Sequence, residues 1–233
     1  MDRLQDDRWR FAGALGVAAI LTAVLIGASR IGAETNARTT EPLLAAESIF
    51  SGIEQQGGAL GSPEAPVTLV EYADLQCPYC AQWARETLPV LVDEYVEAGQ
   101  LRIVFQGLAF IGPDSDKALR TAIAAGQDDH LWDLVHGLYA SQGAENSGWV
   151  TDGLVGEIVS GVPALDGEKL LSARWDRAVD SELRRAAAAA ERAGVHSTPA
   201  FQVGRTGGRL ELVEVSSLGP DGIRPAIEAV LAG

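Results

Sequence analysis

The chain has few of the side chains on which many protein sites depend, with two cysteines and three histidines in 233 residues. Because there is no third cysteine, no thiol remains for a structural disulfide, and any redox chemistry belongs to Cys77 and Cys80. Basic residues are also scarce, with 18 Lys and Arg against 32 Asp and Glu, which gives a net charge of −14. A surface that acidic repels phosphate backbones, so we expect no nucleic-acid partner.

The N-terminus carries the longest apolar run. Hydrophobic residues make up 47% of the chain, which is ordinary for a globular protein and argues against extensive disorder. Residues 11–29 read FAGALGVAAILTAVLIGAS, without a charge. As a helix rising about 1.5 Å per residue, this run would cross the hydrocarbon layer of a bilayer. Arg3, Arg8 and Arg10 precede it, which favours a cytoplasmic N-terminus.

We therefore predict a cytoplasmic N-terminus at 1–10, a transmembrane signal anchor at 11–30, a linker at 31–60 and an exported domain at 61–233. The alternative is a signal peptide cleaved near Ala33, although the apolar run is longer than the roughly 7–15 residues usual in such signals. Cleavage would leave a secreted or periplasmic protein. In both cases the bulk of the chain is extracytoplasmic. A short apolar patch at 49–53 is expected to dock on the domain.

Residues 67–80 read VTLVEYADLQCPYC, an apolar run typical of a buried strand that ends in a C-x-x-C pair. A helical pattern follows, with Pro89 expected to kink it, and the run LRIVF at 101–105 predicts a second strand, parallel to the first. Cys77 would then lie at a helix N-terminus, where unpaired N–H groups and the helix dipole stabilise a thiolate. This placement makes Cys77 the nucleophile and Cys80 the partner that resolves a mixed disulfide.

A C-x-x-C pair has other interpretations. It is half of a zinc site, for which only His130, His136 and His196 could add ligands, and two inert cysteines are a further alternative. His130 and His136 are six positions apart, which places them on different faces of a helix and disfavours a metal site. Redox chemistry is the interpretation that best fits a lone pair after a strand.

The stretch VEYADLQCPYCAQWARETLPVLVDEY, followed by LRIVF, resembles the DsbA-like disulfide oxidoreductases of the thioredoxin superfamily, from about Leu60 to Leu231. The resemblance implies an α/β thioredoxin-like fold with an inserted all-helical subdomain, expected at about 114–195, and no cofactor or metal. Glutaredoxins share CPYC but are shorter and lack the insertion. This chain departs from many relatives in carrying Pro78-Tyr79 between the cysteines instead of Pro-His, and Gln106-Gly107-Leu108-Ala109 instead of Arg-Asp-Phe-Pro.

Glu71 lies in the strand, six residues before Cys77, where the resemblance implies an acid that exchanges a proton with Cys80. A partly buried carboxyl has a raised pKa and can accept that proton. A glutamate that simply reaches solvent is the alternative. Asp74 is expected to be a surface turn residue.

The second half of the site is expected after a helical region. The resemblance implies that Pro199 is a cis proline packed against the cysteine pair, and proline is the residue for which a cis bond costs little. The backbone of Thr198 would pair with an extended substrate strand. His196 is a candidate modulator of Cys77, or an ordinary loop histidine.

Together these features predict a membrane-anchored oxidoreductase that forms disulfide bonds in exported proteins through a redox-active Cys77–Cys80 disulfide. Its partners would be the thiols and disulfides of exported proteins and a membrane redox protein that recycles it. The same site could act as a reductase or isomerase. A non-catalytic chaperone or metal-delivery module is the remaining alternative.

Overall fold

The computed structural model describes residues 49–233, so the predicted anchor at 11–30 lies outside the described residues. None of the helices from residue 49 onward is long and apolar enough to cross a membrane.

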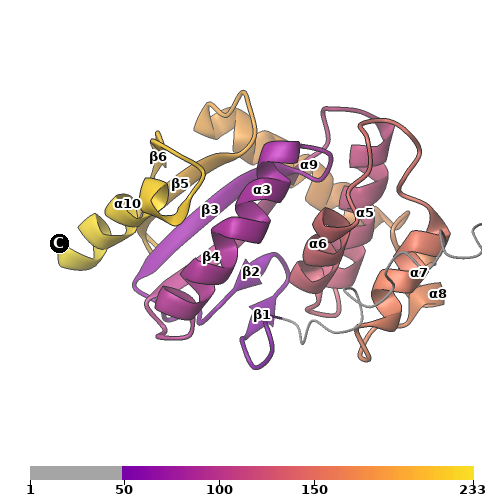
Figure 1. The fold of residues 1–233 in the computed structure, drawn as a ribbon, viewed down its shortest axis with the longest axis horizontal. Coiled ribbons are helices and arrows are strands. Elements are labelled where there is room, and N and C mark those ends of the chain that lie inside the picture. Colours follow the sequence, from indigo (N-terminus) through magenta and orange to yellow (C-terminus); the bar gives the residue numbers. More distant parts are fainter. Residues whose placement is uncertain (1–48) are drawn as a thin grey trace, which may run out of the picture. The chain divides into compact units, whose positions relative to one another are not determined.

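The fold is built on a mixed sheet in the strand order β1-β2-β4-β3-β5-β6 (Figure 1). The central strand β3 (Val67–Asp74) pairs in parallel with β4 (Leu101–Leu108). On its other side β3 pairs antiparallel with β5 (Ala200–Arg205), which in turn pairs with the edge strand β6 (Leu210–Val213). The expected parallel pair is therefore confirmed, and its second strand is longer than the run LRIVF.

A short hairpin completes the sheet where a linker was expected. Strands β1 (Gln55–Gln56) and β2 (Ala59–Leu60) pair with each other, and β2 continues onto β4. The predicted linker at 31–60 therefore contributes its last residues to the folded domain. Phe50 is 3% exposed and its ring lies 5.9 Å from that of Trp132, so the patch at 49–53 does dock.

All eight residues of β3 are buried, because helices cover both faces of the sheet. Side chains alternate along a strand, so Leu69, Glu71 and Ala73 share one face. Leu69 and Ala73 join the main core, which includes buried residues of the helix that follows Cys77. On the opposite face Tyr72 packs in a smaller cluster with Ala190 of α9 (Arg177–Ala193). Glu71 therefore points into the layer that holds the cysteine pair.

The helix after the cysteines is interrupted, as Pro89 predicts. Helix α3 (Pro78–Glu86) stops before Thr87, α4 spans Leu88–Leu91, and one π-helical turn covers Val92–Val96. The Thr87 hydroxyl donates a hydrogen bond to the carbonyl of Leu218, which ties the break to the C-terminal region.

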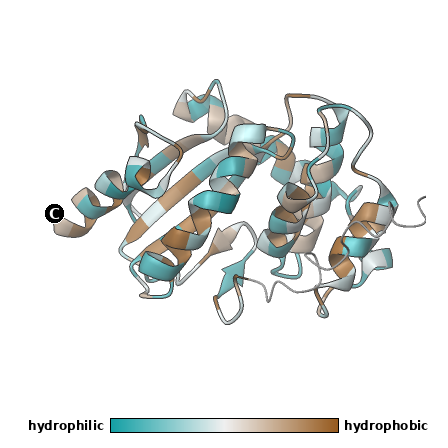
Figure 2. Cartoon of the chain, in the orientation of Figure 1, coloured by the Kyte–Doolittle hydropathy of each residue, from teal (hydrophilic) through white to brown (hydrophobic). Residues whose placement is uncertain are grey.

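In Figure 1 the helices between residues 113 and 173 lie at one end of the sheet and the C-terminal helix lies at the other, while α9 lies against a face of the sheet. Figure 2 shows brown and teal segments on the same helices, as expected for helices with one buried side. The remaining helices are α5 (Pro113–Gly126), α6 (Leu131–Ala140), α7 (Asp152–Ser160), α8 (Gly167–Ala173) and α10 (Pro220–Ala232).

Candidate active site

Cys77 is the residue immediately before α3, with an extended backbone, and Pro78 opens the helix. Pro78 suits this position because its fixed φ is helical and its missing N–H would have no partner in the first turn. Cys77 is 5% exposed and Cys80 is 0% exposed, and both are free, so this is the dithiol form. Tyr79 between them is 61% exposed. Only the Cys77 sulfur is therefore positioned to meet another molecule.

The two thiols have opposite electrostatic surroundings. A hydrogen bond from the Cys80 thiol is the main cause that lowers the pKa of Cys77 to about 6, despite its burial. The side chain of Thr198 and the backbone N–H groups of Cys80 and Tyr79 act in the same direction. Burial raises the pKa of Cys80 well above its ordinary value, and the bond to Cys77 and the charge of Glu71 add to this. At neutral pH the pair therefore holds one thiolate, on Cys77.

Glu71 is buried beneath this pair. Its side chain is 1% exposed, and burial, followed by the charge of Cys77, raises its pKa well above the ordinary value. Its Oε1 has no hydrogen-bond partner within residues 49–233. The alternative of a solvent-exposed glutamate is therefore wrong, and the carboxyl is close enough to Cys80 to affect its pKa.

The Thr198–Pro199 peptide bond is cis, as the resemblance implies. The Cys77 Sγ lies 3.5 Å from the carbonyl oxygen of Thr198, which brings the segment before β5 against the nucleophile. His196 is exposed in the preceding loop and makes no hydrogen bond to Cys77 in the described part of the chain. The structure thus brings Thr198 to the cysteine pair and leaves His196 at the surface.

Asp74 is not a surface residue, and that expectation is wrong. Its side chain is 0% exposed and its two carboxylate oxygens accept four hydrogen bonds. The donors are the backbone N–H groups of Gln76, Phe110 and Ile111 and the hydroxyl of Ser115. Burying a carboxylate costs free energy unless hydrogen-bond donors surround it. Three of these four donors belong to residues at least 36 positions away in sequence.

Sequence reasoning also missed two residues of the helical region that contact residues 74–77, the cysteine loop. The Tyr139 hydroxyl, fully buried in α6, donates to the carbonyl of Asp74. The Gln142 side chain donates to the carbonyls of Leu75 and Cys77. A tyrosine in an apolar helical stripe and a glutamine after a helix give no signal in sequence of these contacts.

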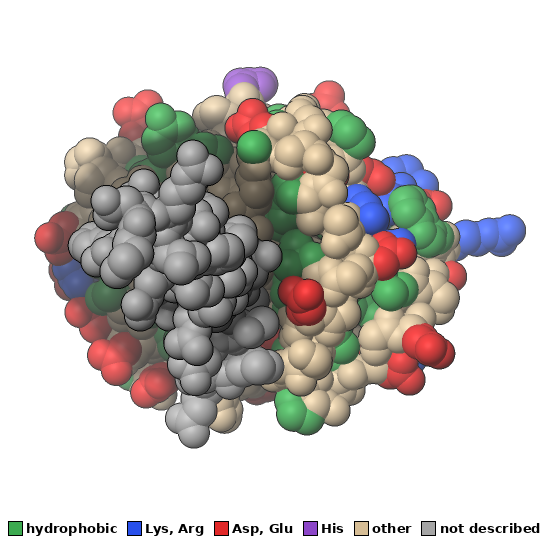
Figure 3. Space-filling model, turned by 45° about the vertical axis from the view of Figure 1, so that its right-hand side comes forward, with side chains coloured by type: hydrophobic (Ala, Val, Ile, Leu, Met, Phe, Trp, Pro, Cys, Tyr) green, Lys and Arg blue, Asp and Glu red, His purple; other side chains and the backbone are tan. Residues whose placement is uncertain are grey.

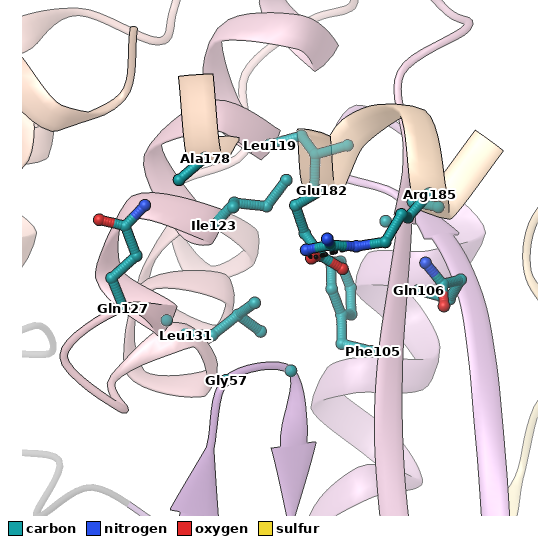
Figure 4. A pocket seen from close by; sticks show the side chains of 14 residues that line it. Gly57, Phe105, Gln106, Leu119, Ile123, Gln127, Leu131, Ala178, Glu182 and Arg185 are labelled. Carbon is teal, nitrogen blue, oxygen red and sulfur yellow. Dashed lines mark hydrogen bonds and ion pairs between the residues drawn. The ribbon is translucent and has the colours of Figure 1, made fainter. Parts of the chain in front are cut away.

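A separate hollow of about 220 Å³ lies away from the cysteines, between β4, α5, α9 and the turn at Gly57 (Figure 4). Glu182 and Arg185 pair at its side, and its lining includes Phe105, Leu119 and Ile123. It contains none of the residues of the redox site. No group of three or more His, Cys, Asp or Glu side chains suited to a metal ion occurs among residues 49–233.

A thioredoxin-like sheet that presents a C-x-x-C pair at a helix N-terminus, opposite a cis proline, defines a thiol–disulfide oxidoreductase. Comparison with known proteins agrees. Residues 54–209 match the family model described as Thioredoxin. The chain is 31% identical over 148 residues to the probable disulfide bond formation protein D of Bacillus anthracis, covering 62% of this chain and 68% of that one.

Two solved structures share the fold. The oxidised BdbD of Bacillus subtilis superimposes with a TM-score of 0.67 at 23% identity, covering 78% of this chain and 98% of that one. The alpha-DsbA1 of Wolbachia pipientis gives 0.64 at 18% identity, covering 75% of this chain and 90% of that one. The chain belongs to the thioredoxin superfamily and, within it, to the DsbA-like disulfide oxidoreductases.

Proposed function

We propose that this oxidoreductase works as an oxidase outside the cytoplasm, where it transfers the Cys77–Cys80 disulfide to exported proteins. One observation carries the direction: the pKa of Cys77 is lowered to about 6. A thiolate that is stable at neutral pH favours the dithiol form of the enzyme, which makes its disulfide a stronger oxidant. In a reductase, by contrast, the disulfide form must be favoured over the dithiol form.

The reaction begins when a substrate thiolate attacks the Sγ of Cys77 in the oxidised enzyme. The S–S bond between Cys77 and Cys80 breaks, a bond between the substrate sulfur and Cys77 forms, and the electron pair leaves on Cys80. Because burial disfavours a Cys80 thiolate, that sulfur must be protonated, and Glu71 beneath it is the proposed acid.

A second substrate thiolate then attacks the substrate sulfur of the mixed disulfide. Cys77 leaves as a thiolate, and its low pKa makes it a good leaving group. The substrate has lost two electrons and gained a disulfide, and the enzyme has become the dithiol. A membrane redox partner is proposed to remove those two electrons and restore the Cys77–Cys80 disulfide. Attack by Cys80 on the mixed disulfide is the competing step that releases the substrate unoxidised.

Thr198 and Pro199 are proposed to hold the substrate. The Thr198 carbonyl lies beside the Cys77 sulfur, and an extended segment can pair with the backbone there as an added strand. The exposed Tyr79 and Pro78 border the same opening. Asp and Glu side chains are spread over the face shown in Figure 3, whereas Lys and Arg are fewer and lie mostly at its right-hand edge. This acidic surface and the net charge of −14 support a preference for basic substrates.

The location outside the cytoplasm rests on the apolar run at 11–29, which is proposed to form a transmembrane anchor at 11–30 that holds residues 61–233 on the far side of the membrane. The names of the Bacillus relatives, which are disulfide bond formation proteins, support the same role. A cleaved signal would release the domain without changing its chemistry.

The reduction potential of the full chain, equilibrated against glutathione, tests the direction. We expect a value nearer ~−120 mV than ~−270 mV, the values typical of a strong oxidant and of thioredoxin. Cys77→Ser should abolish peptide oxidation. Cys80→Ser, incubated with a peptide disulfide, should accumulate a mixed disulfide at Cys77, because no Cys80 thiol is left to displace the peptide. A potential near ~−270 mV would contradict the oxidase and favour a reductase, and full activity of Cys77→Ser would contradict the mechanism.

A further inference from the structure

A closed ring of hydrogen bonds surrounds the loop that leads into Cys77. The Ser115 hydroxyl donates to Asp74 Oδ1 over 2.6 Å, and the Gln76 Nε2 donates to the Ser115 oxygen over 3.0 Å. The same Nε2 lies 3.1 Å from the Asn146 Oδ1, and the Asn146 N–H donates back to the Gln76 Oε1 over 2.6 Å. The Asn146 Nδ2 donates to the carbonyl of Ile111, whose own N–H donates to Asp74 Oδ2.

The ring joins segments that are distant in sequence. Asp74 and Gln76 belong to the cysteine loop, Ser115 to the first turn of α5, and Asn146 to the connection between α6 and α7. Asp74, Gln76 and Ser115 are at most 1% exposed, whereas Asn146 is exposed and holds a positive φ of 55°. The buried polar groups of such a network must be satisfied by hydrogen bonds, and a satisfied network fixes one geometry.

We propose that this ring positions Cys77, so that Asp74 and Gln76 are positioning residues for the redox reaction. Gln76 directly precedes Cys77, and the Cys77 N–H donates to the carbonyl of Asp74 over 2.9 Å. The ring therefore fixes the backbone on the N-terminal side of the nucleophile, while α3 fixes the other side. The inference rests on the proposed role of Cys77 as nucleophile.

The position of the sulfur matters because its thiolate depends on directional contacts. The Cys80 thiol, the Thr198 side chain and the N–H groups of Tyr79 and Cys80 all lower the pKa of Cys77. Hydrogen bonds weaken steeply when their angle or distance departs from the optimum. Opening the ring lets the loop move, which weakens these contacts and raises the pKa of Cys77.

A purely electrostatic role of Asp74 would have the opposite sign. Removing a carboxylate near Cys77 removes a like charge, which would lower the pKa of Cys77. In Asp74→Asn, the amide nitrogen replaces an acceptor with a donor, so two of the four donors lose their acceptor and the ring opens. Gln76→Ala opens the ring without changing any charge.

Both variants are tested in the full chain, reduced, by following the rate of alkylation of Cys77 with iodoacetamide against pH, and by thermal unfolding. The matched control is Asp114→Asn. Asp114 is also buried at the start of α5, and it accepts a hydrogen bond from the Gly148 N–H without contacting the cysteine loop. The ring predicts that Asp74→Asn and Gln76→Ala raise the apparent pKa of Cys77 and slow its alkylation about tenfold at pH ~5, while the control does neither.

An unchanged or lowered pKa in Asp74→Asn would overturn the proposal, as would an equal rise in the control. If Asp74→Asn does not fold, Gln76→Ala decides: a raised pKa supports positioning, and an unchanged one rejects it. A wild-type Cys77 with an ordinary pKa near ~8.5 would instead contradict its role as nucleophile, and the ring would have no thiolate to position.

Discussion

At the scale of single residues, Cys77 and Cys80 lie three positions apart and in opposite surroundings. The first pKa is lowered by hydrogen bonds and the second is raised by burial. This asymmetry links the redox state to stability. A thiol whose folded pKa lies below its unfolded pKa adds stability above the unfolded pKa, and this stability is lost as the pH falls through the folded pKa.

The dithiol form should therefore gain stability over the disulfide form as the pH rises from about 6 towards the ordinary thiol value of about 8.5. The difference in stability is measured from the melting temperatures of the dithiol and disulfide forms between those pH values. Cys77→Ser, with no thiol to titrate, serves as the control. A gap between the two melting temperatures that does not vary with pH would contradict a lowered pKa at Cys77.

The contribution of Glu71 to stability changes with pH in the opposite direction to that of Cys77. Its folded pKa is raised by burial, so its favourable contribution is complete below the unfolded pKa of about 4.3 and is lost as the pH rises through the folded pKa. Glu71→Gln removes the titration and should flatten the fall of stability above that pH, by up to about 1.4 kcal/mol per pH unit. Chemical denaturation of the dithiol form at a series of pH values measures the slope.

The same variant should slow turnover, because Cys80 loses its proposed proton donor, by about 10²-fold if general acid catalysis is typical. Single-turnover oxidation of a peptide separates this from stability. Unchanged turnover in a folded Glu71→Gln protein would remove Glu71 from the mechanism.

The sequence predicted the roles of residues whose partners are close in the chain, and it failed for residues whose partners are distant. The spacing of the cysteines, the strand before them and the proline at 78 are neighbours in the chain, so their geometry follows from sequence. The burial of Asp74 depends on Phe110, Ile111 and Ser115, which lie at least 36 positions away. No local pattern distinguishes such an aspartate from one in an exposed turn.

At the scale of elements, the close packing of α6 on α7 depends on one glycine. A Cβ at Gly137 would lie 2.4 Å from the Ile158 Cγ2, whereas a Cβ at Gly156, in α7, would meet nothing within 4 Å. Both positions are helical, so helix propensity favours alanine equally at both.

Gly137→Ala should therefore destabilise the protein by about 1–3 kcal/mol through overpacking. Gly156→Ala should be neutral or stabilise it by up to about 1 kcal/mol. Thermal or urea unfolding of the two variants compares them directly. Equal effects at both positions would show that the two helices do not pack as closely as described.

Among the elements, those with a clear apolar pattern were predictable, and the shortest hairpin was not. The apolar run of β3 predicts a buried strand, and the amphipathic pattern of α6 predicts a helix. The hairpin of β1 and β2 has two residues per strand, and Gln55 and Gln56 are polar. Its position is set by pairing with β4, a tertiary contact that no local pattern specifies.

At the scale of the whole molecule, the net charge of −14 should set the rate at which substrates arrive. A cationic peptide with a cysteine pair should be oxidised about tenfold more slowly at ~1 M salt than at ~0.01 M, because the Debye length falls from about 30 Å to about 3 Å. A neutral peptide of the same length should be unaffected. Equal salt dependence for both peptides would show that charge does not guide substrates.

The small opening at Cys77 also affects the stage of folding at which a substrate protein can react. With 5% of the residue exposed, a cysteine on an extended, unfinished chain can approach the sulfur, while one set in a rigid folded surface is held off by its neighbours. The enzyme would thus act on polypeptides soon after they emerge and disengage as they fold. A folded protein would keep its disulfides because they could no longer reach the Cys77 sulfur, and no separate control of the reaction would be needed.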